Sequence, residues 1–86
     1  MKLNKLQLDL LKYIVSDKQI EELEARKARV AKRREAAEEL GSILVSSDFV
    51  VSEWNRLYKE ELELELQIIN LKKFQTEFML EIMNAE

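Results

Sequence analysis

The chain has 86 residues, 14 of them Lys or Arg and 17 Asp or Glu, which gives a formal net charge of −3. The absence of Cys and His excludes disulfides and thiolate metal sites, and it removes the usual zinc ligands and the usual acid–base residue. A chain this short allows one small domain, whose stability depends on regular helix packing or on self-association. We accordingly expect no enzyme activity, no metal or cofactor and no small-molecule substrate.

Charged residues make up 36% and apolar residues 47% of the sequence, a mixture typical of coiled coils rather than of disordered chains. No apolar run approaches the ~18 residues that a membrane span needs. The first residues place Asn, Lys, Gln and Asp among leucines, which is unlike a signal peptide. We therefore expect a cytoplasmic protein that does not enter a membrane.

The first predicted element is a helix over residues 3–40. Its first turns carry two apolar stripes, one made by Leu3, Leu6, Leu10 and either Tyr13 or Ile14, the other by Leu8, Leu11 and Val15. A two-stranded coiled coil needs only one narrow stripe, so the second stripe predicts a further partner. Ser16 and Gln19 have the spacing of a capping box, which leaves open a kink near residues 16–20, although we favour a continuous helix.

From residue 20 to residue 40 the apolar edge becomes thin. Lys27 and Arg34 occupy core-like positions there, between Ile20, Leu23 and Val30. Gly41 fits the position just after a helix, where a left-handed backbone is cheap only for glycine. We predict a turn over residues 41–47, with Ser46 or Ser47 as the cap of the next helix.

The second predicted helix covers residues 48–83. It carries the best heptad of the chain, with Val50, Leu57, Leu64, Leu71 and Phe78 at one position and Trp54, Ile68 and Ile82 at the other; Glu61 and Gln75 interrupt the second series. Leu62, Leu66, Ile69 and Leu80 add a second apolar face. The alternation of Glu and Leu over residues 61–66 resembles a strand, but the flanking pattern is helical for several turns.

These elements predict an all-α fold, a long antiparallel helical hairpin in a single domain over residues 1–86. Folding about residue 44 places the basic stretch 26–34 beside residues 54–62, and residues 3–20 beside residues 68–85. The predicted hairpin core consists of Ile20, Leu23, Val30, Val50, Trp54, Leu57, Leu64, Ile68 and Leu71. The terminal half is apolar on two faces, and burying the second face stabilises by ~25 cal/mol per Å².

That second face predicts a homo-oligomer, either a four-helix bundle or a larger ring. The predicted oligomer interface consists of Leu6, Leu10, Leu11, Ile14, Leu62, Leu66, Ile69, Phe74, Phe78 and Ile82.

The stretch from Arg26 to Arg34 holds six positive charges in nine residues. Arg26, Arg29 and Arg33 form one stripe, which makes them candidate nucleic-acid contacts. The other interpretation, which we favour, is charge matching with acidic residues of the second helix. The acidic residues 60–65 are interpreted in the same way, because carboxylate metal sites in helical bundles usually include a His.

Residues 22–57 combine a helix rich in Ala, Arg, Lys and Glu, the turn Leu40-Gly41-Ser42-Ile43-Leu44-Val45, the pair Val50 and Trp54, and a further helix. This order resembles the central region of the small terminase subunits of lambda-type phages. The turn is one residue longer here, and the Leu-Pro often found late in the second helix of that family is absent. The likeness covers less than half of the chain.

The resemblance implies a DNA-packaging accessory protein in the host cytoplasm, with another protein of the packaging complex as a partner. In that family the central hairpin assembles subunits, and a separate N-terminal winged-helix domain binds DNA. Residues 1–20 are too short for that domain, so no DNA-recognition residue is carried over. The chain then corresponds either to an excised assembly region or to a small unrelated hairpin.

Three functions remain open from the sequence. The first is a structural, self-assembling module, in its specific form the oligomerisation core of a packaging subunit. The second is a stand-alone coiled-coil adaptor or inhibitor that grips another protein. The third is nucleic-acid binding through the basic stretch.

Overall fold

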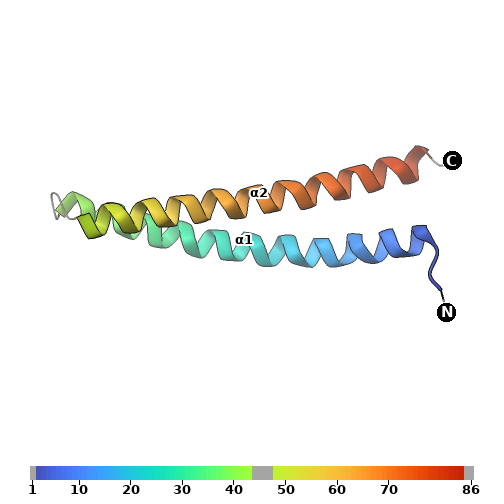
Figure 1. The fold of residues 1–86 in the computed structure, drawn as a ribbon, viewed down its shortest axis with the longest axis horizontal. Coiled ribbons are helices and arrows are strands. Elements are labelled where there is room, and N and C mark those ends of the chain that lie inside the picture. Colours follow the sequence, from blue (N-terminus) through green and yellow to red (C-terminus); the bar gives the residue numbers. More distant parts are fainter. Residues whose placement is uncertain (1, 44–47, 85–86) are drawn as a thin grey trace.

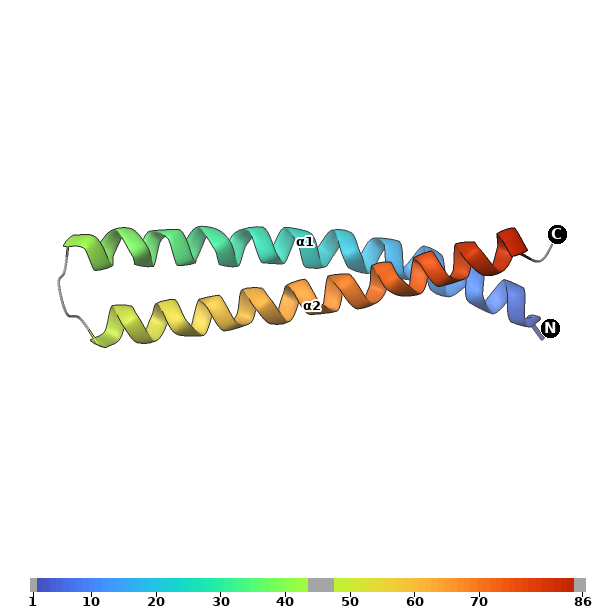
Figure 2. The ribbon, with the colours of Figure 1, turned by 90° about the horizontal axis from the view of Figure 1, so that it is seen from above.

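The protein is an extended hairpin of two antiparallel α-helices (Figures 1 and 2). The structure, a computed structural model, describes residues 2–43 and 48–84, without the side chains of residues 42 and 43. Helix α1 is Lys5–Ile43 with 39 residues, and helix α2 is Asp48–Asn84 with 37 residues. The molecule measures 61 × 26 × 14 Å. The predicted all-α hairpin is confirmed, and the described residues contain no strand, so residues 61–66 are helical as expected.

Helix α1 begins at a capping box that the sequence interpretation missed. The amide of Gln7 donates to Asn4 Oδ1 at 2.8 Å, and the amide of Asn4 donates to Gln7 Oε1 at 3.0 Å. These two bonds occupy donors that the first turn of a helix cannot use internally. The helix then continues through residues 16–20 as one element, in agreement with the favoured continuous helix.

The prediction that Gly41 follows the end of the first helix is wrong. Helix α1 continues to Ile43, and the φ of Gly41 lies outside the left-handed region. A Cβ added to Gly41 would meet Val50 Cγ1 at 3.5 Å, an ordinary contact, so a side chain of one carbon fits there. Helix α2 starts at Asp48, whose charge suits the N-terminal end of the helix dipole. The predicted caps Ser46 and Ser47 lie outside the described residues.

The hairpin core is a single row of side chains between the two helices. Leu57, the most deeply buried large side chain, is 2% exposed and packs in a cluster with Val30 and Leu64, against which Leu23 also packs. The buried apolar residues are Ile20, Val30, Ala37, Val50, Leu57, Leu64, Ile68 and Phe78. Three other predicted core residues are half-buried: Leu23, Trp54 and Leu71.

The register of the two helices differs from the predicted one. A fold axis at residue 44 would place Lys27 beside residue 61 and Ser16 beside residue 72. The structure instead joins Lys27 to Glu65 and Ser16 to Gln75, a shift of about one helical turn. The cause is the extension of α1 beyond Leu40, which delays the chain reversal.

The two ends of the hairpin differ in how many side chains they bury. The helices twist about each other, because Figure 1 shows the ribbons overlapping near the turn and separate near the termini, and Figure 2, turned by 90°, shows the reverse. We call α1 residues 24–43 with α2 residues 48–68 the turn half, and α1 residues 5–23 with α2 residues 69–84 the terminal half. Apart from Ile20, Phe78 and the polar Ser16, all buried side chains among the described residues belong to the turn half.

Candidate functional site

Two residues of the basic stretch point across the hairpin and pair with acidic residues of α2. Arg34 Nε donates to Glu61 Oε2 at 2.6 Å, and Lys27 Nζ forms an ion pair with Glu65. All four side chains are partly buried. Partly burying these charged side chains costs little free energy, because each cation donates to a carboxylate of the other helix. Polar pairs at core positions of this kind also fix the register of two helices. The predicted charge matching is therefore present in the turn half.

Arg34 also belongs to a small network at the entry to the turn. Its Nη1 lies 2.7 Å from Glu38 Oε1, and the same oxygen accepts a hydrogen bond from Trp54 Nε1 at 2.9 Å. The Trp54 ring stacks on Tyr58 with centroids 5.0 Å apart and an interplanar angle of 8°. The half-buried Trp54 thus links α1 and α2 through its indole N–H as well as its ring.

The ion pairs across the hairpin raise the pKa of both basic groups. The hydrogen bond that Lys27 donates to Glu65 raises the pKa of Lys27 above its ordinary value of 10.5. The hydrogen bond to Glu61 likewise raises the pKa of Arg34, so both cations stay charged under all ordinary conditions. On α2, the hydrogen bond from Arg56 lowers the pKa of Glu53. None of these groups is arranged as a proton donor or acceptor for neutral pH.

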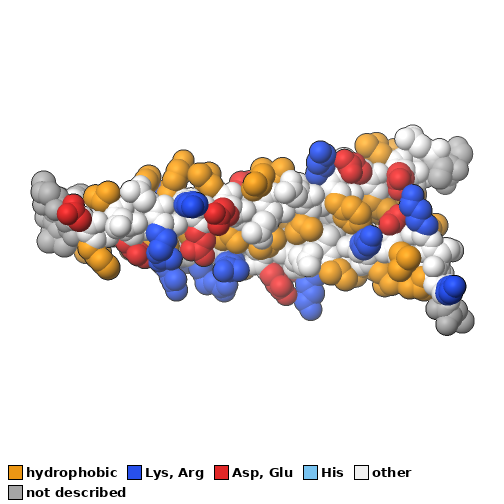
Figure 3. All heavy atoms as spheres, in the orientation of Figure 1, with side chains coloured by type: hydrophobic (Ala, Val, Ile, Leu, Met, Phe, Trp, Pro, Cys, Tyr) orange, Lys and Arg blue, Asp and Glu red, His pale blue; other side chains and the backbone are white. Residues whose placement is uncertain are grey.

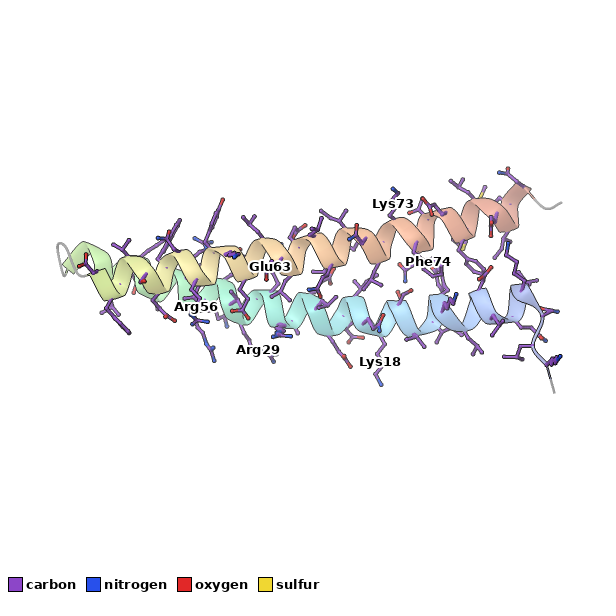
Figure 4. All side chains as sticks on the ribbon, viewed as in Figure 1. Lys18, Arg29, Arg56, Glu63, Lys73 and Phe74 are labelled. Carbon is purple, nitrogen blue, oxygen red and sulfur yellow. The ribbon has the colours of Figure 1, made fainter. Side chains whose placement is uncertain are left out.

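The candidate nucleic-acid stripe runs along one side of α1, where Arg26 and Arg29 border a groove that α2 also lines. The Arg29 side chain points away from α2 (Figure 4). Arg26 is 61% exposed and lies 3.9 Å from Glu60. Arg33 exerts its charge on Glu53 and helps to lower the pKa of that carboxyl. Acidic side chains of α2 therefore offset part of this stripe, which weakens the case for phosphate contact.

Deeper in the terminal half, a polar contact replaces the apolar core. Ser16 is 3% exposed; its hydroxyl donates to the Tyr13 carbonyl at 2.7 Å and accepts from Gln75 Nε2 at 3.0 Å. In the sequence, Gln75 interrupts the heptad and Ser16 has the spacing of a cap. The structure shows that the two interruptions meet and satisfy each other.

Phe78 corrects the predicted oligomer interface. It is 4% exposed and lies inside the hairpin, with its ring centroid 5.6 Å from that of Tyr13 and 6.4 Å from that of Phe74. Phe78 has the same heptad position as Leu64 and Leu71, and this position indicates a place in the hairpin core. Phe74 is half-buried, and it belongs partly to the core and partly to the surface.

The first turns of α1 carry exposed apolar side chains on almost every face. Tyr13 is the only large apolar residue between Leu3 and Val15 that is even half-buried. The exposed members are Leu3, Leu6, Leu8, Leu10, Leu11, Ile14 and Val15, each between 43% and 60% exposed. Asp9, by contrast, is half-buried, so in these turns the apolar residues are more exposed than a neighbouring charge.

The outer face of α2 carries a second apolar surface, which we call the outer α2 stripe. It consists of Leu62, Leu66, Ile69, Leu80 and Met83, each more than half exposed. Lys73 and Thr76 continue the same spacing of three and four residues between Ile69 and Leu80. Figure 4 shows Lys73 pointing away from α1, and Figure 3 shows apolar side chains along this edge. The spacing is that of a coiled-coil seam without a partner.

A groove runs between the helices beside these surfaces. Its apolar part is lined by Leu8, Leu11, Val15, Leu71 and Phe74. Figure 3 shows apolar side chains of both helices gathered at the end that carries the termini. Of the predicted interface residues, the structure leaves Leu6, Leu10, Leu11, Ile14, Leu62, Leu66, Ile69 and Ile82 exposed. Met79 and Met83 are also exposed and were not among the predicted interface residues, although the spacing of the second apolar face of α2 could have identified Met83.

The chain matches no protein-family model, and neither the curated proteins nor the solved structures contain a match. Within residues 2–43 and 48–84, no three acidic residues are grouped so as to hold a metal ion. Neither described helix is apolar enough over a sufficient length to cross a membrane.

Proposed function

We propose that the protein is a non-enzymatic, self-assembling helical module whose terminal half packs against further copies of the same chain. The observation that carries this proposal is the exposure of two apolar surfaces, the first turns of α1 and the outer α2 stripe, which begins at Leu62 and extends into the terminal half. Large contiguous apolar surfaces of this kind mark interaction sites in water. The residues cover more than one face, so a single hairpin cannot bury them.

The exposed area supports the same proposal. The hairpin exposes 7100 Å², whereas a compact protein of 10.2 kDa exposes about 5300 Å². The excess of about 1800 Å² is larger than the ~800 Å² that each partner contributes to a standard protein interface. A second copy in an interface of standard size would thus cover a little under half of this excess.

The narrower proposal is that this module forms the oligomerisation core of a phage DNA-packaging subunit. It rests on the likeness of residues 22–57 to the small terminase subunits. The exposed apolar surfaces are compatible with it and do not depend on it. A gene for a large packaging ATPase next to the gene for this chain would support the narrower proposal, and an unrelated neighbourhood would remove its basis.

The test of self-assembly is the mass of the purified chain at micromolar concentration, measured by light scattering or sedimentation. The expected result is a closed species of at least twice 10.2 kDa. The double variant Leu66→Glu with Ile69→Glu places two charges in the outer α2 stripe, and we expect its mass to fall towards that of one chain.

Arg29→Glu is the matched control, because Arg29 is exposed on α1 away from both apolar surfaces. We expect this variant to keep the mass of the parent. A strictly monomeric parent would contradict self-assembly and favour an adaptor that binds a different protein.

A further inference from the structure

The outer α2 stripe carries information about how a second copy lies on it. Lys73 and Thr76 fill the gap in this stripe between Ile69 and Leu80. Lys73 is the one charged residue in this gap at the spacing of the stripe, and it points away from α1 (Figure 4). Leu66 and Leu80 are one heptad before and after Lys73 and share its face. A symmetric dimer that pairs through this stripe therefore has to accommodate Lys73 of both copies in its interface.

A parallel pairing of two α2 helices puts each residue opposite itself. Lys73 would then face Lys73 of the second copy inside an apolar seam, where like charges repel and desolvation is costly. Thr76 would likewise face Thr76.

An antiparallel pairing resolves the problem with the same residues. With Leu66 opposite Met83 and Ile69 opposite Leu80 of the second copy, Lys73 lies opposite Thr76, next to Glu77 of that copy. The two lysines then no longer face each other but are offset by three residues along the seam, about 4.5 Å, and each meets an acidic neighbour. No pair of like charges faces across the flanks, where Asn70 approaches Glu77 and Lys72 approaches Met79 of the second copy.

We propose that two hairpins associate with their outer α2 stripes antiparallel, so that the terminal halves overlap and the turn halves point in opposite directions. This inference rests on the proposed self-assembly and adds its geometry. The overlap covers roughly residues 66–83 of each α2, about 26 Å at the helical rise of 1.5 Å per residue.

The absence of cysteine allows a direct measurement of this geometry. Spin labels are attached to Lys59→Cys in the turn half and, separately, to Asn70→Cys near the centre of the overlap, both at exposed positions. Pulsed electron resonance then gives the distance between the two copies. The antiparallel pairing predicts about 45 Å along the helix axis for position 59 and about 15 Å for position 70. A parallel pairing predicts less than about 20 Å for both.

A charge exchange gives an independent readout. Lys73→Glu should weaken dimerisation by about threefold to tenfold, because the new carboxylate meets Glu77 of the second copy. Adding Glu77→Lys should restore the affinity in the antiparallel pairing. Positions 73 and 77 are also i,i+4 neighbours on one helix, so the helicity of the dilute monomers, measured by circular dichroism, gives the intrahelical share of any rescue. In a parallel pairing the rescue does not exceed that share, because the new carboxylate at position 73 still faces its own counterpart in the second copy.

The outcomes separate the two proposals. A dimer with a short distance at position 59, or with no rescue by the double variant beyond the intrahelical share, overturns the antiparallel geometry and leaves self-assembly standing. A monomeric parent overturns both. A long distance at position 59 with a short one at position 70 supports the antiparallel geometry.

Discussion

Near the turn, the two helices are held together by a continuous row of buried side chains and by paired charges. Leu57 and Leu64 pack against Val30, and Arg34 and Lys27 each reach an acidic partner on α2. Near the termini, only Ile20, Phe78 and the polar Ser16 are buried among the described residues, while a larger set of leucines and isoleucines faces outward. The turn half thus contains most of the buried core, although Phe49 and Val51 stay exposed there. The terminal half contains a larger number of apolar residues that the hairpin has no means to cover.

This contrast is not a difference in helix quality, because α1 and α2 are continuous through both halves. It is a difference in how many faces are apolar. Two helices can bury one stripe each, and any second stripe stays in water until another helix arrives. The comparison therefore separates the contacts that stabilise one hairpin from the apolar surfaces that the proposed self-assembly would cover.

The largest effect on the turn half should come from Leu57→Ala. Leu57 is 2% exposed, and removing its buried methyl groups should cost about 2–4 kcal/mol of unfolding free energy. The measurement is chemical denaturation followed by circular dichroism at several protein concentrations. Val51→Ala, at a side chain 58% exposed in the same half, should change stability by less than about 0.5 kcal/mol. Equal losses for the two variants would show that the turn half has no specific core.

A smaller loss is expected from Glu61→Leu, which removes the acceptor for Arg34 Nε and leaves that cation paired with Glu38. The double variant Arg34→Leu with Glu61→Leu should recover the lost stability, because replacing both members of a partly buried pair with apolar residues is often neutral or stabilising. A thermal double-mutant cycle measures the coupling. Additive effects of the two single changes would show that the pair does not couple the two helices of the turn half.

In the terminal half, Gln75→Ala removes the donor to the buried Ser16 hydroxyl and should cost about 1 kcal/mol. The thermal midpoint of the dilute protein measures this loss. Asn55→Ala, at an exposed position of the same helix, serves as the control and should shift the midpoint much less. If both variants behave alike, the Ser16–Gln75 contact makes no contribution to the terminal half.

The smallest expected effect is a loss of thermal stability at alkaline pH. The pKa of Lys27 is raised by Glu65, so its stabilising charge is fully present below its ordinary value of 10.5 and is lost as the pH rises through the raised value. Thermal midpoints between about pH 9 and pH 11.5 should fall more in the parent than in Lys27→Met. Lys32→Met, at an exposed position, should keep the alkaline fall of the parent. An unchanged fall in Lys27→Met would assign the alkaline loss to other groups.

Much of the candidate site was visible in the sequence for a simple reason. Helical spacing assigns residues to faces, so the second face formed by Leu62, Leu66 and Ile69 could be recognised before any partner helix was placed. The assignment of Phe78 failed, although its heptad position pointed inward. Residues 3–15 are apolar on several faces, and only the position of Tyr13 beside Phe78 decides which aromatic ring is covered.

By itself, the sequence determined two long helices, their antiparallel return and the surplus of apolar residues near the termini, because these follow from local propensity and from the 3.6-residue period. Only the tertiary structure decided the register. The hydrophobic periodicity of each helix stays the same when one helix slides past the other by a turn, so it cannot fix the register. The register depends on where α1 ends and on which side chains contact each other. The register is fixed by the contacts of Ser16 with Gln75, Lys27 with Glu65 and Arg34 with Glu61.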